Sequence, residues 1–175
     1  MTDRIRNVLF LCTGNSARSI LAEALLNREG AGRFRAFSAG SQPKGEPHPA
    51  ALALLSDQGF PIDGLRSKGW EEFAVPGAPQ MDLIITVCDS AAGETCPIWP
   101  GHPTTAHWGI EDPAAVEGEG QRQAFFNAMT YLQRSISLLV NLPDSDLDTL
   151  AGLQRVREIG RTEGASLGVE EQTGG

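Results

Sequence analysis

The stretch VLFLCTGNSARS, residues 8–19, joins an apolar run to a turn of small polar residues. A continuous apolar run such as 8–11 is typical of a strand that is buried on both faces of a parallel sheet. The run ends on Cys12, and Arg18 follows six residues later. The stretch therefore predicts a buried strand that carries a thiol at its carboxyl end, then a tight loop with an arginine.

Predicted strands and helices alternate along the rest of the chain. Apolar residues at helical spacing predict a helix that follows the first loop and ends near Gly30. The next segments, in chain order, are a strand at 34–40, a helix at 48–58, a buried strand at 82–88, a short strand at 104–110, a helix at 121–141 and a short helix around 147–156. This alternation predicts an α/β layered domain with a mostly parallel sheet.

The composition is that of a soluble globular protein. The 175 residues are 41% hydrophobic and 21% charged, with a formal net charge of −8. No apolar run approaches the roughly 20 residues that span a bilayer, and the first residues lack a secretory signal, so we expect a cytoplasmic protein. The negative charge argues against nucleic-acid and membrane partners. An anionic substrate would therefore need a local positive potential.

The chain is expected to divide into a main domain and an extension. Residues 1–142 hold the alternating elements, whereas 143–175 begin with a proline and two aspartates. The last fifteen residues, 161–175, are rich in glycine and acidic side chains and have little to bury, which predicts a disordered tail after a short helix.

The loop after the first strand is a candidate oxyanion site. Small residues and the start of a helix allow backbone N–H groups to converge on one anion. An arginine can add a bidentate pair of hydrogen bonds to two oxygens of that anion. The same positive field lowers the pKa of a nearby thiol and makes Cys12 a candidate nucleophile. The predicted oxyanion-binding residues are Thr13, Gly14, Asn15, Ser16, Ala17, Arg18 and Ser19. As an alternative, Cys12 is a buried apolar residue and Arg18 a solvated one.

The other two cysteines, Cys88 and Cys96, are eight residues apart. In a helix their Cα atoms would be about 12 Å apart, whereas a disulfide needs less than about 7 Å. The pair can therefore bridge only if the short segment between them unwinds, as in a mobile redox shuttle. Inert thiols are one alternative, and a zinc site with His102 and His107 is another. That spacing fits no common zinc finger, so we expect no metal.

The two predicted buried strands both end on a cysteine, Cys12 and Cys88. Ligands of parallel sheets lie beyond the carboxyl ends of the strands, so both thiols are expected at the same rim. Asp112 precedes Pro113, which favours an extended conformation that projects the carboxylate from a loop. It is a candidate general acid, and a plain surface aspartate is the alternative.

The stretch LCTGNSARS, residues 11–19, resembles the low-molecular-weight tyrosine phosphatase family, and in particular the arsenate reductases built on that fold. The resemblance covers roughly residues 6–141. It implies a three-layer αβα fold with a four-stranded parallel sheet and an anion loop at its carboxyl rim. Phosphate or sulfate would be analogue ligands.

The resemblance also implies roles for the three thiols in arsenic detoxification. Cys12 would attack arsenate, Cys88 would attack Cys12 and release arsenite, and Cys96 would carry the disulfide outward. Asp112 would protonate the departing oxygen. No tightly bound cofactor is implied, and the partner is an external dithiol reductant: thioredoxin, with glutathione and glutaredoxin as the other source.

The alternative function is a low-molecular-weight protein tyrosine phosphatase that hydrolyses phosphomonoesters through a Cys12 phospho-enzyme. Phosphatases of this branch usually carry an aromatic residue after the Asp-Pro pair, whereas this chain has Ala114. Its sole tyrosine, Tyr131, lies in the predicted long helix. Both observations favour the reductase, and a non-catalytic oxyanion-binding module is a third hypothesis.

Reductases of this type can also bind potassium near the loop. Asn15, Glu23 and Ser38 match three of the ligand positions, and Lys68 stands at the fourth, where an aspartate is expected. An ammonium there would replace the cation, so we expect no potassium requirement.

Overall fold

The computed structural model describes residues 5–87, 104–147, 154, 156, 158 and 159. Its centre is a parallel sheet with the strand order β2-β1-β3-β4. The strands are β1 (Arg6–Cys12), β2 (Phe34–Gly40), β3 (Leu83–Thr86) and β4 (Thr104–His107). The helices are α1 (Arg18–Glu29), α2 (Pro49–Asp57), α4 (Gly120–Val140) and α5 (Asp144–Leu147), with 3₁₀ turns η1 (Trp70–Phe73) and η2 (Pro113–Ala115).

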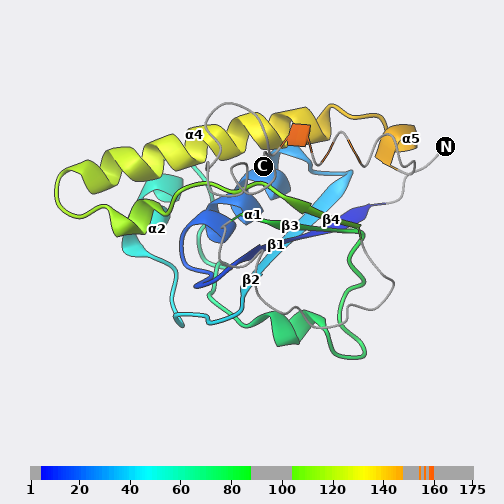
Figure 1. Cartoon of the computed structure of the whole chain (residues 1–175), viewed down its shortest axis with the longest axis horizontal. Helices are drawn as coiled ribbons and strands as arrows, with labels where there is room; N and C mark the ends of the chain where they lie inside the picture. Colours follow the sequence, from blue (N-terminus) through cyan, green and yellow to red (C-terminus); the bar gives the residue numbers. More distant parts are fainter. Residues whose placement is uncertain (1–4, 88–103, 148–153, 155, 157, 160–175) are drawn as a thin grey trace, which may run out of the picture.

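The two faces of the sheet are covered by different parts of the chain (Figure 1). Val8 and Phe10 of β1 belong to the large core under α1 and α4. Leu9 and Leu11 point to the opposite face, into a smaller cluster that includes Phe73 of η1. Alternate residues of a strand face opposite sides, so a central strand with both faces covered must be apolar throughout. The predicted fold class is confirmed.

The elements predicted up to residue 141 agree with the observed ones except at some ends, whereas most of the short helix predicted around 147–156 lies outside the described residues and α5 ends at Leu147. α1 begins at Arg18 and ends against Gly30, whose N–H donates to the Leu26 carbonyl at 2.8 Å. The strand predicted over 104–110 ends at His107, and the fully buried Trp108 follows it. Neither 3₁₀ turn was predicted, since segments of three or four residues have no useful periodicity.

Part of the C-terminal extension packs on the main domain. Leu147, Val156 and Ile159 are buried in the same core as the sheet and α4. The Trp108 indole N–H donates to the Val156 carbonyl at 2.9 Å, at a buried position. The predicted tail at 161–175 lies outside the described residues. Among the helices that the structure describes, none is long and apolar enough to cross a membrane.

Candidate active site

The loop that connects β1 to α1 lies against a second segment, residues 42–48, which we call the strap. Three loop carbonyls accept hydrogen bonds of 2.8–3.0 Å from strap N–H groups: Thr13 from Gln42, Gly14 from Lys44 and Ser16 from His48. In a trans peptide the N–H points opposite to the carbonyl. The strap thus orients the carbonyls outward, and the N–H groups that follow them turn to the other side, as an oxyanion site requires.

Asn15 fixes the middle of the loop. Its backbone has a φ of 44°, a left-handed conformation that asparagine tolerates better than most residues. The fully buried side chain donates to the Ser19 hydroxyl at 2.8 Å and accepts from the Lys68 N–H at 2.8 Å. The loop is therefore tied both to the first turn of α1 and to a segment about fifty residues away.

The start of α1 carries no side-chain cap. Ala17 occupies the N-cap position, and its methyl group cannot accept a hydrogen bond. The N–H groups of a first helical turn have no partner inside the helix and favour an anion. The predicted residues 13–19 thus form the loop and the uncapped first turn of α1.

Arg18 connects this turn to the loop after β4. Its guanidinium donates to the Ile110 carbonyl at 2.9 Å and lies 3.7 Å from the Asp112 carboxylate. Its Nε is buried and has no hydrogen-bond partner among the described residues. A buried donor without a partner is costly, and an oxyanion oxygen would satisfy it.

Asp112 has the extended conformation expected before a proline, with φ −75° and ψ 110°. Its carboxylate caps the 3₁₀ turn η2 by accepting from the Ala114 N–H at 3.0 Å. The side chain is 40% exposed, beside a guanidinium that is 12% exposed. The neighbouring Glu111 is exposed. Asp112 is thus the carboxylate that faces the arginine of the loop.

Cys88 and Cys96 lie outside the described residues, as does His102 of the alternative zinc site. The strand that leads to Cys88 is described. β1 and β3 are parallel neighbours, with Leu11 opposite Thr86, and the Val87 N–H donates to the Leu11 carbonyl at 2.8 Å. The carboxyl ends of both strands therefore lie at one edge of the sheet, and buried Cys12 is at that edge.

A buried polar cluster lies next to the loop. The Lys68 ammonium is 4.0 Å from the Glu23 carboxylate and 3.5 Å from the Ser38 hydroxyl, and it donates to the Arg66 carbonyl at 2.7 Å. Burial raises the pKa of Glu23, and the Lys68 charge opposes that shift. Burial likewise lowers the pKa of Lys68, and Glu23 opposes this shift. Glu23, Ser38 and Lys68 are therefore in contact, whereas Asn15 meets only the Lys68 backbone N–H.

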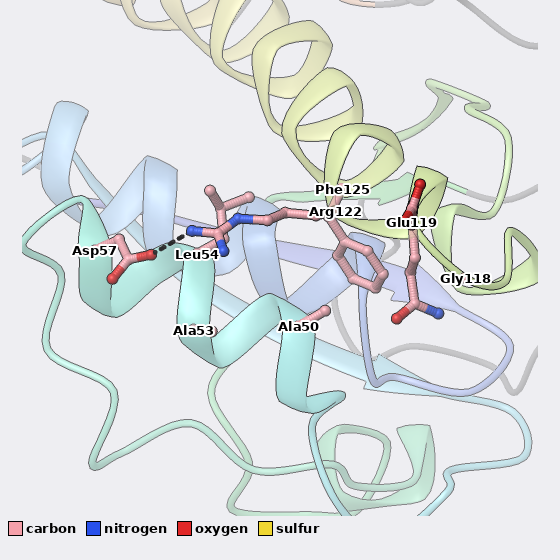
Figure 2. A pocket seen from close by; sticks show the side chains of 9 residues that line it. Ala50, Ala53, Leu54, Asp57, Gly118, Glu119, Arg122 and Phe125 are labelled. Carbon is pink, nitrogen blue, oxygen red and sulfur yellow. Dashed lines mark hydrogen bonds and ion pairs between the residues drawn. The ribbon is translucent and has the colours of Figure 1, made fainter.

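A hollow of about 480 Å³ lies between α2 and the start of α4 (Figure 2). Ala50, Ala53, Leu54 and Phe125 supply apolar walls, and the Arg122–Asp57 ion pair of 3.3 Å lies at its edge. Of the predicted site residues that the structure describes, none lines it. The His48 ring packs against the Phe125 ring with their centroids 4.9 Å apart and their planes tilted by 39°, and the His48 backbone N–H binds the anion loop.

Sequence reasoning missed the strap and its residues. His48 caps α2 by accepting from the Ala50 N–H at 3.0 Å. The Ser67 hydroxyl donates to the Gly14 carbonyl at 3.1 Å and accepts from the Gly45 N–H at 3.2 Å. The two prolines of the strap, Pro43 and Pro47, were the local signal of a stiff segment, but they do not indicate what it binds.

The sequence model of the low-molecular-weight phosphotyrosine protein phosphatases matches residues 7–148. The chain belongs to this family. An arsenate reductase of Bacillus licheniformis is 36% identical over 122 residues, which are 69% of this chain and 84% of that protein. An arsenate reductase of Bacillus subtilis is 35% identical over 120 residues, with 68% and 83% covered.

Solved structures agree with this relationship. An arsenate reductase in the phosphate-binding state matches with a TM-score of 0.64 and 26% identity, covering 78% of this chain and 97% of that one. A thioredoxin-dependent arsenate reductase of Corynebacterium glutamicum matches with a TM-score of 0.55 and 26% identity, covering 79% and 65%. The similarity therefore extends over the sheet and its flanking helices.

Proposed function

We propose that this chain is an arsenate reductase that uses Cys12, Cys88 and Cys96 in a thiol–disulfide relay. The observation that carries the proposal is the pair Cys88 and Cys96 after β3 in a chain whose relatives, at about 35% identity, are arsenate reductases. A phosphatase needs only the anion loop and an acid, whereas reduction needs thiols that supply two electrons.

Arsenate would bind in the loop 13–19. The inward N–H groups and the uncapped start of α1 supply donors, and the unpartnered Nε of Arg18 supplies a charged one. An arsenate reductase solved in a phosphate-binding state supports a tetrahedral oxyanion as the ligand. Phosphate and sulfate are the expected competitors.

In the first step the Cys12 thiolate attacks arsenic and forms an S–As bond, and one oxygen leaves as water. Asp112 would give the proton that this oxygen needs. Its position, 3.7 Å from the Arg18 guanidinium, supports that role because both side chains would contact the same anion.

In the second step the Cys88 thiolate attacks the Cys12 sulfur. An S–S bond forms, the S–As bond breaks, and its electron pair reduces As(V) to arsenite. The Cys96 thiolate then attacks Cys88, which restores the Cys12 thiolate and leaves a Cys88–Cys96 disulfide. The shared sheet edge of β1 and β3 supports the first exchange.

An external dithiol then reduces the Cys88–Cys96 disulfide and becomes a disulfide itself. We propose thioredoxin as this partner, because a matching structure is a thioredoxin-dependent arsenate reductase. Glutathione with glutaredoxin is the other source of the same two electrons. No tightly bound cofactor is needed, since every electron passes through sulfur.

Lys68 also supports an activity that does not depend on potassium. Its ammonium already occupies the space beside Glu23 and Ser38 and supplies a positive charge there. We expect equal turnover in potassium and sodium buffers of the same ionic strength. A several-fold stimulation by potassium alone would contradict this expectation.

The function is tested by arsenate-dependent NADPH oxidation with thioredoxin and thioredoxin reductase. Wild type should turn over many times, and Cys88→Ser and Cys96→Ser should not. Cys12→Ser, the matched control, should abolish even a single turnover. Full turnover of either Cys88→Ser or Cys96→Ser would refute the relay. Hydrolysis of p-nitrophenyl phosphate without arsenate reduction would instead favour the phosphatase, and glutaredoxin in place of thioredoxin tests the partner.

A further inference from the structure

Lys44 lies across the anion loop at the position where Gly14 has no side chain. Its N–H donates to the Gly14 carbonyl at 3.0 Å. A Cβ built on Gly14 would be 3.3, 3.5 and 3.2 Å from the Cγ, Cδ and Cε atoms of Lys44. The lysine stem therefore packs along the loop backbone, and its ammonium is one bond beyond the contact.

The strap holds Lys44 in this place. Gln42 and His48 bind the loop carbonyls on either side of it, and the Gly45 N–H donates to the Ser67 hydroxyl, which itself binds Gly14. Gly45 has a φ of 94°, which a residue with a side chain rarely adopts. The backbone of Lys44 is thus fixed on both sides, so that little backbone freedom is lost when its side chain meets a ligand.

Of the cationic side chains Arg18, Lys68 and Lys44, Lys44 is the one whose charge is not paired with a carboxylate of the described residues. The formal net charge of the chain is −8, which repels an anion. Arg18 lies beside Asp112, and the Lys68 ammonium is buried against Glu23. Lys44, by contrast, is exposed and forms no ion pair among the described residues.

We propose that Lys44 is a substrate-binding residue of this site, whose ammonium adds a second positive charge at the edge of the loop for an inorganic tetrahedral oxyanion. For arsenate this inference rests on the proposed function, and for phosphate it concerns binding alone. The lysine attracts the anion and holds it in the ground state, so it acts on affinity rather than on the chemical step.

The test compares Lys44→Met with Arg35→Met. Methionine keeps most of the stem that packs on Gly14 and removes only the charge. Arg35 is exposed near the amino end of β2, whereas the loop begins at the carboxyl end of the neighbouring parallel strand, so the control makes the same change in net charge away from the site. Lys44→Arg restores a cation.

Calorimetry measures the Kd of inorganic phosphate, and NADPH oxidation measures KM and kcat for arsenate. At low ionic strength Lys44→Met should raise both Kd and KM about five-fold and change kcat less than about two-fold. The effect should nearly vanish at about 1 M salt, where charges are screened within about 3 Å. Arg35→Met should change Kd by less than about 1.5-fold, and Lys44→Arg should recover most of the affinity.

Two outcomes would overturn the proposal: an unchanged phosphate Kd in Lys44→Met, or an equal change in Arg35→Met. The first would mean that the stem only covers Gly14, and the second that only the overall charge matters. If wild type binds phosphate but does not reduce arsenate, the proposed function fails while the Kd comparison still decides the role of Lys44.

Discussion

Gly40 ends β2 directly against the anion loop, and its lack of a side chain is a testable requirement of the site. A Cβ at this position would be 2.5 Å from the Thr13 carbonyl oxygen and 2.9 Å from both the Asn15 nitrogen and the Cys12 carbonyl oxygen. All three contacts are with backbone atoms, which cannot rotate away as a side chain can. Gly40→Ala must therefore displace either β2 or the loop.

The expected loss of stability follows from these contacts. Extra methyl groups in a packed site cost about 1–3 kcal/mol, and three backbone contacts place Gly40→Ala at the upper end. Replacing glycine stiffens the unfolded chain and returns about 0.4–1 kcal/mol. The net loss in the free energy of unfolding should be about 2 kcal/mol. A loop shifted by about 1 Å should also lose about 100-fold in the rate of the chemical step.

Urea unfolding measures the stability, and single-turnover reduction of arsenate measures the rate of the chemical step. With a slope of about 2 kcal/mol per molar urea, the midpoint should fall by about 1 M. Gly64→Ala is the matched control, because a Cβ there meets nothing within 4 Å. The control should keep the wild-type rate and a stability within about 1 kcal/mol of wild type. If Gly40→Ala matches wild type in both measurements, close packing of β2 against the loop is not a requirement of the site.

Three further changes test other parts of the structure. Asp112→Asn should lower the single-turnover rate at least about 100-fold and leave the phosphate Kd within about three-fold of wild type, because the substitution removes the proton donor but not the loop. An unchanged rate would exclude Asp112 as the general acid. Trp108→Phe should lower the free energy of unfolding by about 1–3 kcal/mol, since the buried Val156 carbonyl loses its donor; a change below about 0.5 kcal/mol in urea would contradict this. Burial raises the pKa of Glu23, so the folded protein keeps a proton above pH 4.5 that the unfolded chain loses. Wild-type stability should therefore fall as pH rises from 4.5 through that raised pKa, and Glu23→Gln should flatten the profile.

The central strand and the buried thiol at its end could be read from the sequence for a physical reason. A parallel strand covered on both faces must be continuously apolar, and residues 8–11 are. The helix after the loop follows from the spacing of its apolar residues, and the extended backbone of Asp112 follows from Pro113. These are local constraints, which a short stretch of chain carries by itself.

Contacts between distant segments were decided only by the tertiary structure. Arg18 reaches the Ile110 carbonyl across 92 residues, and Asn15 accepts from the Lys68 backbone across 53. The strap that orients the loop carbonyls comes from beyond β2 and has no periodicity that marks it. Local patterns record which face of an element is buried, but not which other segment covers it. The position of the thiol at the end of β1 could therefore be predicted from the sequence, whereas the arrangement of donors and charges around that thiol depends on the folded chain.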